Sequence, residues 1–113
     1  GLTISLENIQ FEPDSNKLLP QEKKKLEKIG EILSDFTNDL LITGHTALRG
    51  TASGRQKLSE ERAQAVADFL ISNGIRDQYH IFTQGLGASD PIASNETEAG
   101  RSRNRRVEIT IMD

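Results

Sequence analysis

Two stretches with helical periodicity alternate with short apolar stretches, and this alternation limits the folds open to the chain. The first helical stretch begins at Pro20, whose missing N–H suits a first turn, and its apolar stripe is Leu26, Ile29, Ile32, Leu33 and Phe36. The second is expected to begin at the N-cap Ser59 and to stop at Asn73-Gly74, with the stripe Ala63, Val66, Ala67, Leu70 and Ile71. Both stripes predict a helix that buries one face.

Four other stretches predict strands. Residues 2–11 open the chain with a register change near Asn8, 40–46 form a buried apolar run, and 79–84 and 107–111 alternate apolar with polar residues. Strands alternating with helices make a βαβαβ core, with right-handed crossovers where paired strands are parallel. The last strand follows no long helix, so we expect it to run antiparallel to its neighbour. The predicted fold is α/β, a βαβαββ two-layer sandwich with two amphipathic helices on one face of a four-stranded mixed sheet.

Composition narrows the class of protein. The 113 residues suffice for one domain, and they contain neither a signal peptide nor an apolar run long enough to cross a bilayer. We therefore expect the chain to start mid-protein or after processing. The absence of cysteine excludes disulfides and thiolate metal sites. A net charge of -3 argues against a general nucleic-acid binder, which needs a basic surface to neutralise phosphates.

Two long connections are the places where a site is expected. Residues 47–57, with Gly50, Ser53 and Gly54, are interpreted as a loop. Residues 87–104 are too long for an idle connection, so they are either functional or contain a short helical turn around 96–102. Ligands of open α/β sheets bind beyond the strand ends. Thr46, the loop after it, the start of the second helix and the long late loop are therefore the predicted site.

Arginines dominate that predicted site. Arg62 lies in the second helix, and a late cluster holds Arg101, Arg103, Arg105 and Arg106. A guanidinium fork matches a carboxylate bidentately, so a ligand with a carboxylate is the first hypothesis. The alternative is that these arginines pair with nearby acids of the chain, which are Glu96, Glu98, Glu108 and Asp113. The lysine-rich run at 22–28 is interpreted instead as the solvated face of the first helix.

Three blocks carry a family resemblance in their order and spacing. They are Gly44-His45-Thr46, then Leu58-Ser59-Glu60-Glu61-Arg62-Ala63, then the run from Asn95 through Arg106-Val107-Glu108-Ile109. Asn8-Ile9-Gln10-Phe11, Gln84-Gly85-Leu86-Gly87 and Asp90-Pro91-Ile92 add to them. Together these blocks resemble the OmpA-like peptidoglycan-binding domain. The resemblance implies that residues 1–113 are one such domain, excised from a larger envelope protein.

The resemblance also implies a function and a place. Domains of this family anchor outer-membrane proteins, lipoproteins and flagellar stator proteins to the cell wall, by gripping the diaminopimelate of the peptidoglycan stem peptide. The expected location is the periplasm of a diderm bacterium, associated with the outer membrane. Any membrane attachment would come through other parts of the parent protein, such as a lipoprotein anchor, a β-barrel or a transmembrane helix.

Site residues follow from the resemblance position by position. The family's key pair is an acid directly after Gly-His-Thr and an arginine fifteen positions later; the arginine is Arg62, but the acid falls on Ala47. Arg55 stands where the family usually has Asn, and Gly54 replaces a common aromatic residue. Other positions that match pocket residues are Asp14, Thr46, Asn104, Arg105 and Arg101. Gly100 and Arg106 also match family positions, but their role is interpreted as structural. Asp14 is the candidate to replace the missing carboxylate.

Two functions stay open at this point. One is a wall-binding module with an altered, weakened diaminopimelate pocket, or one adapted to a stem peptide with ornithine or lysine as its third residue. The other is a scaffold that no longer binds peptidoglycan and serves an envelope protein partner. An enzyme is not predicted, and neither a cofactor nor a metal is implied, because His45 and His80 stand without Cys or a paired acidic motif.

Overall fold

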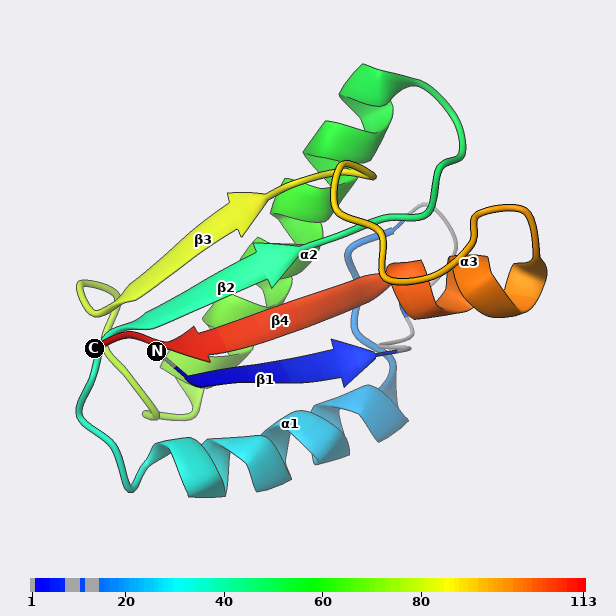
Figure 1. Cartoon of the computed structure of the whole chain (residues 1–113). Helices are drawn as coiled ribbons and strands as arrows, with labels where there is room; N and C mark the ends of the chain where they lie inside the picture. Colours follow the sequence, from blue (N-terminus) through cyan, green and yellow to red (C-terminus); the bar gives the residue numbers. More distant parts are fainter. Residues whose placement is uncertain (1, 8–10, 12–14) are drawn as a thin grey trace.

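The computed structural model describes residues 2–7, 11 and 15–113. Within that part of the chain the elements are β1 (Leu2–Glu7), α1 (Pro20–Leu33), β2 (Leu40–Gly44), α2 (Ala52–Ser72), β3 (Ile81–Gly85), α3 (Glu98–Asn104) and β4 (Arg106–Ile111). In the view of Figure 1 helix α2 passes behind the sheet, α1 lies below the edge strand β1, and the short α3 lies beyond one end of the sheet. The predicted α/β sandwich is confirmed.

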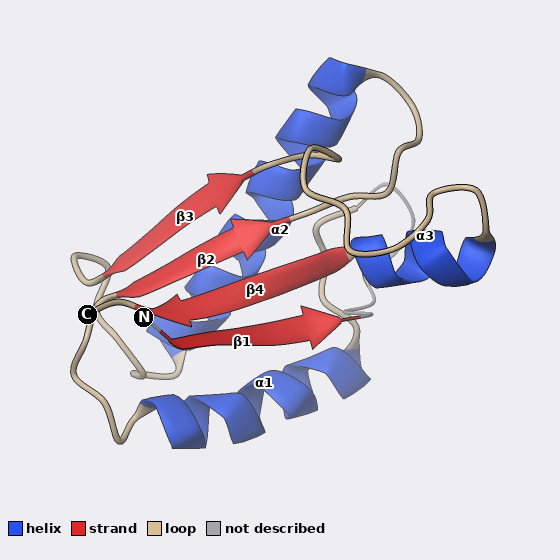
Figure 2. Ribbon diagram, in the orientation of Figure 1, coloured by secondary structure: helices blue, strands red, loops and turns tan. Residues whose placement is uncertain are grey.

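The strand order of the sheet is β1-β4-β2-β3. Strand β4 runs antiparallel to both β1 and β2, and β2 runs parallel to β3, so the expected antiparallel last strand is confirmed. Gly44 at the end of β2 pairs with Gly85 on one side and Val107 on the other. The ends of β2 and β3 therefore meet the start of β4 at one end of the sheet, where the loops in Figure 2 gather.

The core lies between the sheet and α1 and α2. Its fully buried members are Leu26, Leu33, Leu40, Ile42, Ala63, Val66, Leu70 and Ile109. The apolar stripe predicted for α1 was too wide, because Ile32 is 55% exposed and Phe36, 39% exposed, follows the end of the helix at Leu33. Glu22, assigned to the solvated face, is buried and receives a hydrogen bond from Lys25 Nζ at 3.2 Å.

Helix α2 begins at Ala52, earlier than the expected start at Ser59. The N-cap is Thr51, whose hydroxyl accepts a hydrogen bond from Gly54 N at 3.0 Å. Periodicity missed these first turns because their side chains are exposed or half-buried and carry no apolar stripe. The predicted end is confirmed, since Asn73 is the C-cap and Gly74 has a positive φ of 72°.

Ser59 is instead the point at which α2 touches the sheet. It is fully buried, and its hydroxyl donates to Gln56 O at 2.8 Å and accepts from Gly87 N at 3.0 Å. A Cβ added at Gly44 would overlap the carbonyl oxygen of Ser59, and one added at Gly85 would overlap its hydroxyl. These two glycines therefore let the helix lie directly on the ends of β2 and β3, which places the next turn of α2 at the loop end of the sheet.

The late connection contains the short helix expected near residues 96–102. Helix α3 is capped by Thr97, whose hydroxyl accepts from Gly100 N at 3.0 Å. A Cβ at Gly100 would overlap the carbonyl oxygen of Ser94, so the preceding loop folds tightly against the helix.

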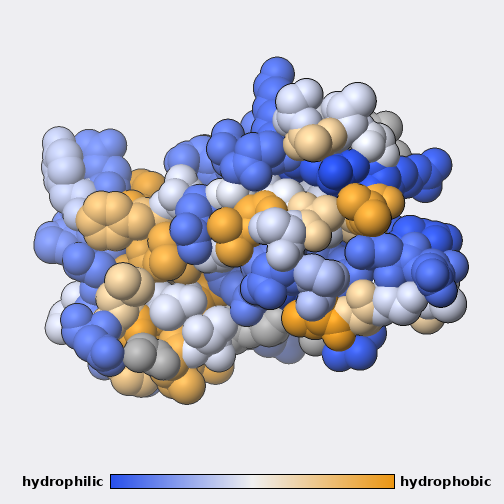
Figure 3. All heavy atoms as spheres, turned by 45° about the horizontal axis from the view of Figure 1, so that its top comes forward, coloured by the Kyte–Doolittle hydropathy of each residue, from blue (hydrophilic) through white to orange (hydrophobic). Residues whose placement is uncertain are grey.

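Hydrophobic surface is uneven over the molecule. In Figure 3 orange atoms gather over the end where β3 begins, the end that carries the exposed Tyr79 and Phe82, and the opposite end is largely hydrophilic. None of the described helices combines the length and apolarity that a membrane span requires.

Candidate ligand-binding groove

A groove of about 810 Å³ opens at the loop end of the sheet. Its lining comes from Phe11, the loop after β2, the first three turns of α2, and α3 with the residue after it. The lining residues are Phe11, Thr46, Ala47, Arg49, Gly50, Thr51, Gly54, Arg55, Lys57, Leu58, Glu61, Arg62, Glu98 and Arg105. Of the predicted site residues, the fold thus brings Thr46, Ala47, Arg55, Arg62 and Arg105 together.

Arg62 is held firmly in this groove. Only 8% of the residue is exposed, although it carries a charge. Its Nε donates a hydrogen bond to Ser15 O at 3.1 Å, and its guanidinium carbon lies 4.9 Å from the centre of the Phe11 ring. A ring face attracts a cation, and the carbonyl fixes one edge of the fork. The guanidinium is therefore preorganised, which lowers the entropic cost of binding a planar anion.

The loop after β2 supplies an apolar and a polar wall residue. Ala47 is 5% exposed, so its methyl group is packed where the family resemblance predicts a carboxylate. Thr46 N donates to Gly87 O at 2.8 Å, which ties the loop to the turn after β3. The Thr46 hydroxyl is buried and has no hydrogen-bond partner among the described residues.

Arg55 lies on the first turns of α2 and folds back over the same loop. Its Nη1 donates to Gly50 O at 2.7 Å, and the residue is half-buried. The side chain lines the groove rather than pointing away from it. Its positive charge therefore acts on whatever occupies the groove.

Arg105 and Arg101 both pair with Glu98. Arg105 Nη2 lies 2.6 Å from Glu98 Oε1, and Arg101 Nε lies 3.2 Å from Oε2. The hydrogen bond from Arg105, followed by that from Arg101, lowers the pKa of the Glu98 carboxyl. Arg105 lines the groove; Arg101 does not, and its Nη1 donates to Asn95 O at 3.0 Å. The alternative that late arginines pair with acids of the chain thus holds for these two, and also for Arg106, whose Nη2 lies 3.1 Å from Glu108 Oε1.

Asn104 lies behind the groove wall and does not line it. The residue is fully buried; its Oδ1 accepts from the backbone of Ile92 and Ala93, and its Nδ2 donates to Asn95 Oδ1 at 2.8 Å. Asn95 Oδ1 in turn accepts from Leu48 N at 3.2 Å. The side chains of Asn104 and Asn95 therefore connect α3 with the loop that carries Ala47. Asn95 was missed as a positioning residue, because a lone Asn in a polar loop gives no sequence signal.

One predicted site residue cannot be placed in this way. Asp14, the candidate to replace the missing carboxylate, lies outside the residues that the structure describes.

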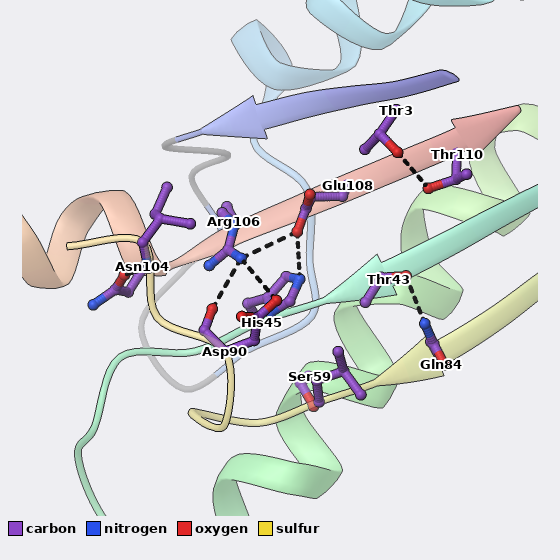
Figure 4. A network of polar contacts seen from close by, with 12 residues as sticks. Thr3, Thr43, His45, Ser59, Gln84, Asp90, Asn104, Arg106, Glu108 and Thr110 are labelled. Atoms are coloured by element: carbon purple, nitrogen blue, oxygen red, sulfur yellow. Dashed lines mark hydrogen bonds and ion pairs between the residues drawn. The ribbon is translucent and has the colours of Figure 1, made fainter. Parts of the chain in front are cut away.

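A polar network around the buried His45 and Arg106 joins β4, the residue after β2 and the turn at Asp90 (Figure 4). His45 Nε2 is 2.6 Å from Glu108 Oε1, and Arg106 Nη2 is 3.1 Å from the same oxygen and 3.0 Å from Asp90 O. His45, Asp90 and Glu108 could converge on a metal ion. Arg106 already places a positive charge among them, however, and this charge disfavours a cation there. The network fastens the turn at Asp90 to the sheet.

The free energy of unfolding should depend on the protonation of His45 in this network. Burial first and the Arg106 charge second lower the pKa of His45, while Glu108 and Asp90 oppose this. The free energy of unfolding is expected to fall as pH drops below about 6.5, since the unfolded chain then takes up a proton that the folded chain resists. His80 has the opposite effect on stability, because the hydrogen bond to Asp39 raises its pKa. Its stabilising contribution is present at low pH and is lost as pH rises through this raised pKa.

Urea unfolding of His80→Gln from pH 8 to pH 5.5 isolates the His45 effect. A steady loss of stability toward low pH is expected, and His45→Gln in the same background should flatten the profile. Equal stability of His80→Gln at both ends of the range would contradict the prediction.

The comparisons with known proteins agree with this architecture. The sequence pattern of the OmpA family matches residues 10–105, which include β2, both long helices, the groove and α3. The chain belongs to the OmpA family.

Individual OmpA-family relatives cover nearly all of this chain. Outer membrane protein A of Bordetella avium is 41% identical over 90% of the chain, and the peptidoglycan-binding protein ArfA of Mycobacterium bovis is 38% identical over 91%. The chain spans only 53% and 32% of those two proteins. The solved cell wall anchor of the T6SS from Pseudomonas aeruginosa superposes with a TM-score of 0.87 at 32% identity, covering 97% of this chain and 80% of that one.

Proposed function

We propose that this OmpA-family chain is a non-catalytic peptidoglycan-binding module that anchors an envelope protein to the sacculus. The observation that carries the proposal is the preorganised Arg62 guanidinium in a groove of about 810 Å³ at the loop end of the sheet. A relative named as peptidoglycan-binding and a neighbour described as a cell wall anchor support it. Residues 1–113 would act as one domain of a larger protein of the cell envelope of a diderm bacterium, on its periplasmic side at the outer membrane.

Within this proposal the pocket has one altered wall. Arg62, Thr46 and Arg105 would contact the stem peptide, whereas Ala47 offers a methyl group and Arg55 a positive charge. Loss of a hydrogen bond to a charged group costs roughly 1.5–3 kcal/mol, so diaminopimelate should bind about tenfold to a hundredfold more weakly than in a pocket with the acid. Arg101 and Asn104 would act by shaping the wall, and Asp14 stays a candidate contact.

Ala47 and Arg55 also favour a second function. A groove that no longer binds the wall could persist on a scaffold whose role is to bind an envelope protein partner. The two functions differ in whether the native chain is retained by peptidoglycan at all.

Co-sedimentation with purified sacculi tests the proposal. The native chain should pellet with sacculi that contain diaminopimelate or with sacculi of its own organism, and the double variant Ala47→Asp, Arg55→Asn should pellet with about tenfold higher affinity. Bovine albumin and the same chain without sacculi are the controls. If only the double variant pellets, the scaffold function replaces wall binding for the native chain; if neither pellets, the groove does not bind peptidoglycan.

A further inference from the structure

We propose that the outer edge of strand β3 accepts an extended segment of a partner protein as an additional strand, and that the side chains of this segment alternate between basic and apolar. The surface is separate from the ligand groove except at Glu61, which lines both. The inference does not depend on peptidoglycan binding.

The first reason is that half of the backbone groups of β3 face away from the sheet. Strand β3 is the last in the order β1-β4-β2-β3, and within the described chain it pairs with β2 alone (Figure 2). Leu40 N donates to His80 O at 3.0 Å. Alternate residues of a parallel strand bond to its neighbour, so the N–H and C=O groups of Ile81 and Thr83 point outward. Outward groups of this kind are a template for another strand.

The second reason is that β3 lacks the side chains that usually protect such an edge. Many edge strands avoid pairing by carrying a charged residue or a proline. Strand β3 (Ile81–Gly85) contains neither, and Phe82 within it is 52% exposed. Gln56 Nε2 donates to Gly85 O at 2.6 Å, so the last carbonyl of the strand already has a partner. The added strand would therefore pair with Ile81 and Thr83.

The third reason is the negative charge beside this edge. A hollow of about 530 Å³ between α2 and β3 is lined by Glu60, Glu61, Gln64, Thr83, Gln84 and Gly85. Both charged residues of this lining are acidic. Glu60 Oε1 accepts from the neutral amide of Gln56 at 2.9 Å and keeps its charge, whereas Glu61 Oε1 lies 3.8 Å from Lys57 Nζ. The hollow therefore attracts a cationic side chain from the added strand.

The two faces of β3 set the alternation expected in the partner. The Thr83 hydroxyl donates to Gln64 Oε1 at 3.3 Å, so this side chain points toward α2 and its acids. On the other face Gln84 Nε2 donates to Thr43 Oγ1 at 3.0 Å (Figure 4), and Phe82 shares that face because alternate residues of a strand point the same way. Cross-strand neighbours should then be basic beside Thr83 and apolar beside Phe82.

A second copy of the chain fits this edge less well. Pairing of β3 with β3 would place Glu60 and Glu61 of both copies along one seam, and like charges that face each other across strands are destabilising. The chain also carries a net charge of -3, which adds to the repulsion between copies. A basic segment of another protein is therefore the occupant that the charges favour.

The test uses a short peptide of alternating lysine and valine as the probe. In a second peptide glutamate replaces lysine, and in a third the backbone nitrogens of the lysine peptide are methylated. NMR titration of the native chain gives Kd, and amide hydrogen exchange shows which N–H groups become protected. The lysine peptide should shift the amide signals of Ile81 and Thr83 and slow their exchange by about tenfold or more. The other two peptides should not bind at the same concentrations.

Charge reversal beside the edge provides a matched pair of variants. Glu60→Lys combined with Gln64→Lys changes the charge of the hollow by two units and one unit, and should raise Kd for the lysine peptide about fivefold or more. Gln21→Lys combined with Glu27→Lys makes the same change at two exposed positions of α1 and should raise Kd by less than about twofold.

Four other outcomes overturn the inference. Equal binding of the methylated peptide would show attraction by charge without strand pairing, and equal weakening by both double variants would show an effect of net charge alone. Absence of binding, or signal shifts confined to residues outside β3 and α2, would remove the site. Dimerisation of the native chain that protects Ile81 and Thr83 would make a second copy the occupant. None of these readouts uses sacculi, so they are independent of the test of wall binding.

Discussion

Replacing Arg62 with alanine is expected to lower the affinity for peptidoglycan by tenfold to more than a hundredfold. The guanidinium is the most buried charge in the described lining, and its orientation by Ser15 O and Phe11 is the basis for the proposed role as anchor for a carboxylate. Removing one charged partner of a hydrogen-bonded pair costs about 1.5–3 kcal/mol of binding free energy. Co-sedimentation with sacculi at a series of protein concentrations measures the change. Arg62→Lys should recover only part of the loss, because an ammonium lacks the planar fork.

A matched control separates binding from stability. Arg76 is also a buried arginine that donates to backbone carbonyls, those of Asn38, Leu33 and Ile75, but it lies away from the groove lining. Arg76→Ala should lower the urea midpoint while the folded protein still pellets with sacculi. If Arg62→Ala binds as the native chain does, or Arg76→Ala loses binding equally while folded, Arg62 is not the anchor.

Gly44→Ala is expected to lower the free energy of unfolding by about 3 kcal/mol, a large part of the stability of a small domain. The added Cβ would overlap the backbone carbonyl of Ser59, which cannot rotate away as a side chain could. The variant must therefore push α2 off the ends of β2 and β3. Urea unfolding followed by circular dichroism measures the loss. A shift of the helix would also displace Arg62, so any folded fraction should bind sacculi more weakly.

Gly30→Ala is the matched control for this substitution. Gly30 is buried in α1, and its nearest neighbours are the Cδ1 and Cγ1 atoms of Ile75 at 3.1 Å, which belong to a side chain. The crowding is offset by the gain in helix propensity of roughly 1 kcal/mol, so a change of less than about 1 kcal/mol is expected. Equal losses for the two variants would contradict the close approach at Ser59.

Local sequence patterns determined the kinds of element and their order. The apolar spacing in α2 at Ala63, Val66 and Leu70 predicts a buried helical face. That face is buried in the structure, because packing it against the core is how an amphipathic helix removes its apolar side chains from water. The alternation at 107–111 likewise predicts β4, and Gly74 the end of α2. The resemblance to the family motif, and not spacing alone, distinguished Arg62 from the other arginines.

Only the tertiary structure decided which side chains share the groove. Phe11 and Ser15 hold Arg62 from far away in the chain, and Asn104, matched to the pocket by resemblance, proves to support the wall from behind. A hydroxyl before two acids gives Ser59 the local signature of a helix cap, but its contacts with Gly87 and with Gly44 at the end of β2 make it a packing point. Such contacts depend on how closely segments far apart in the sequence approach one another in the fold, and local periodicity does not predict this.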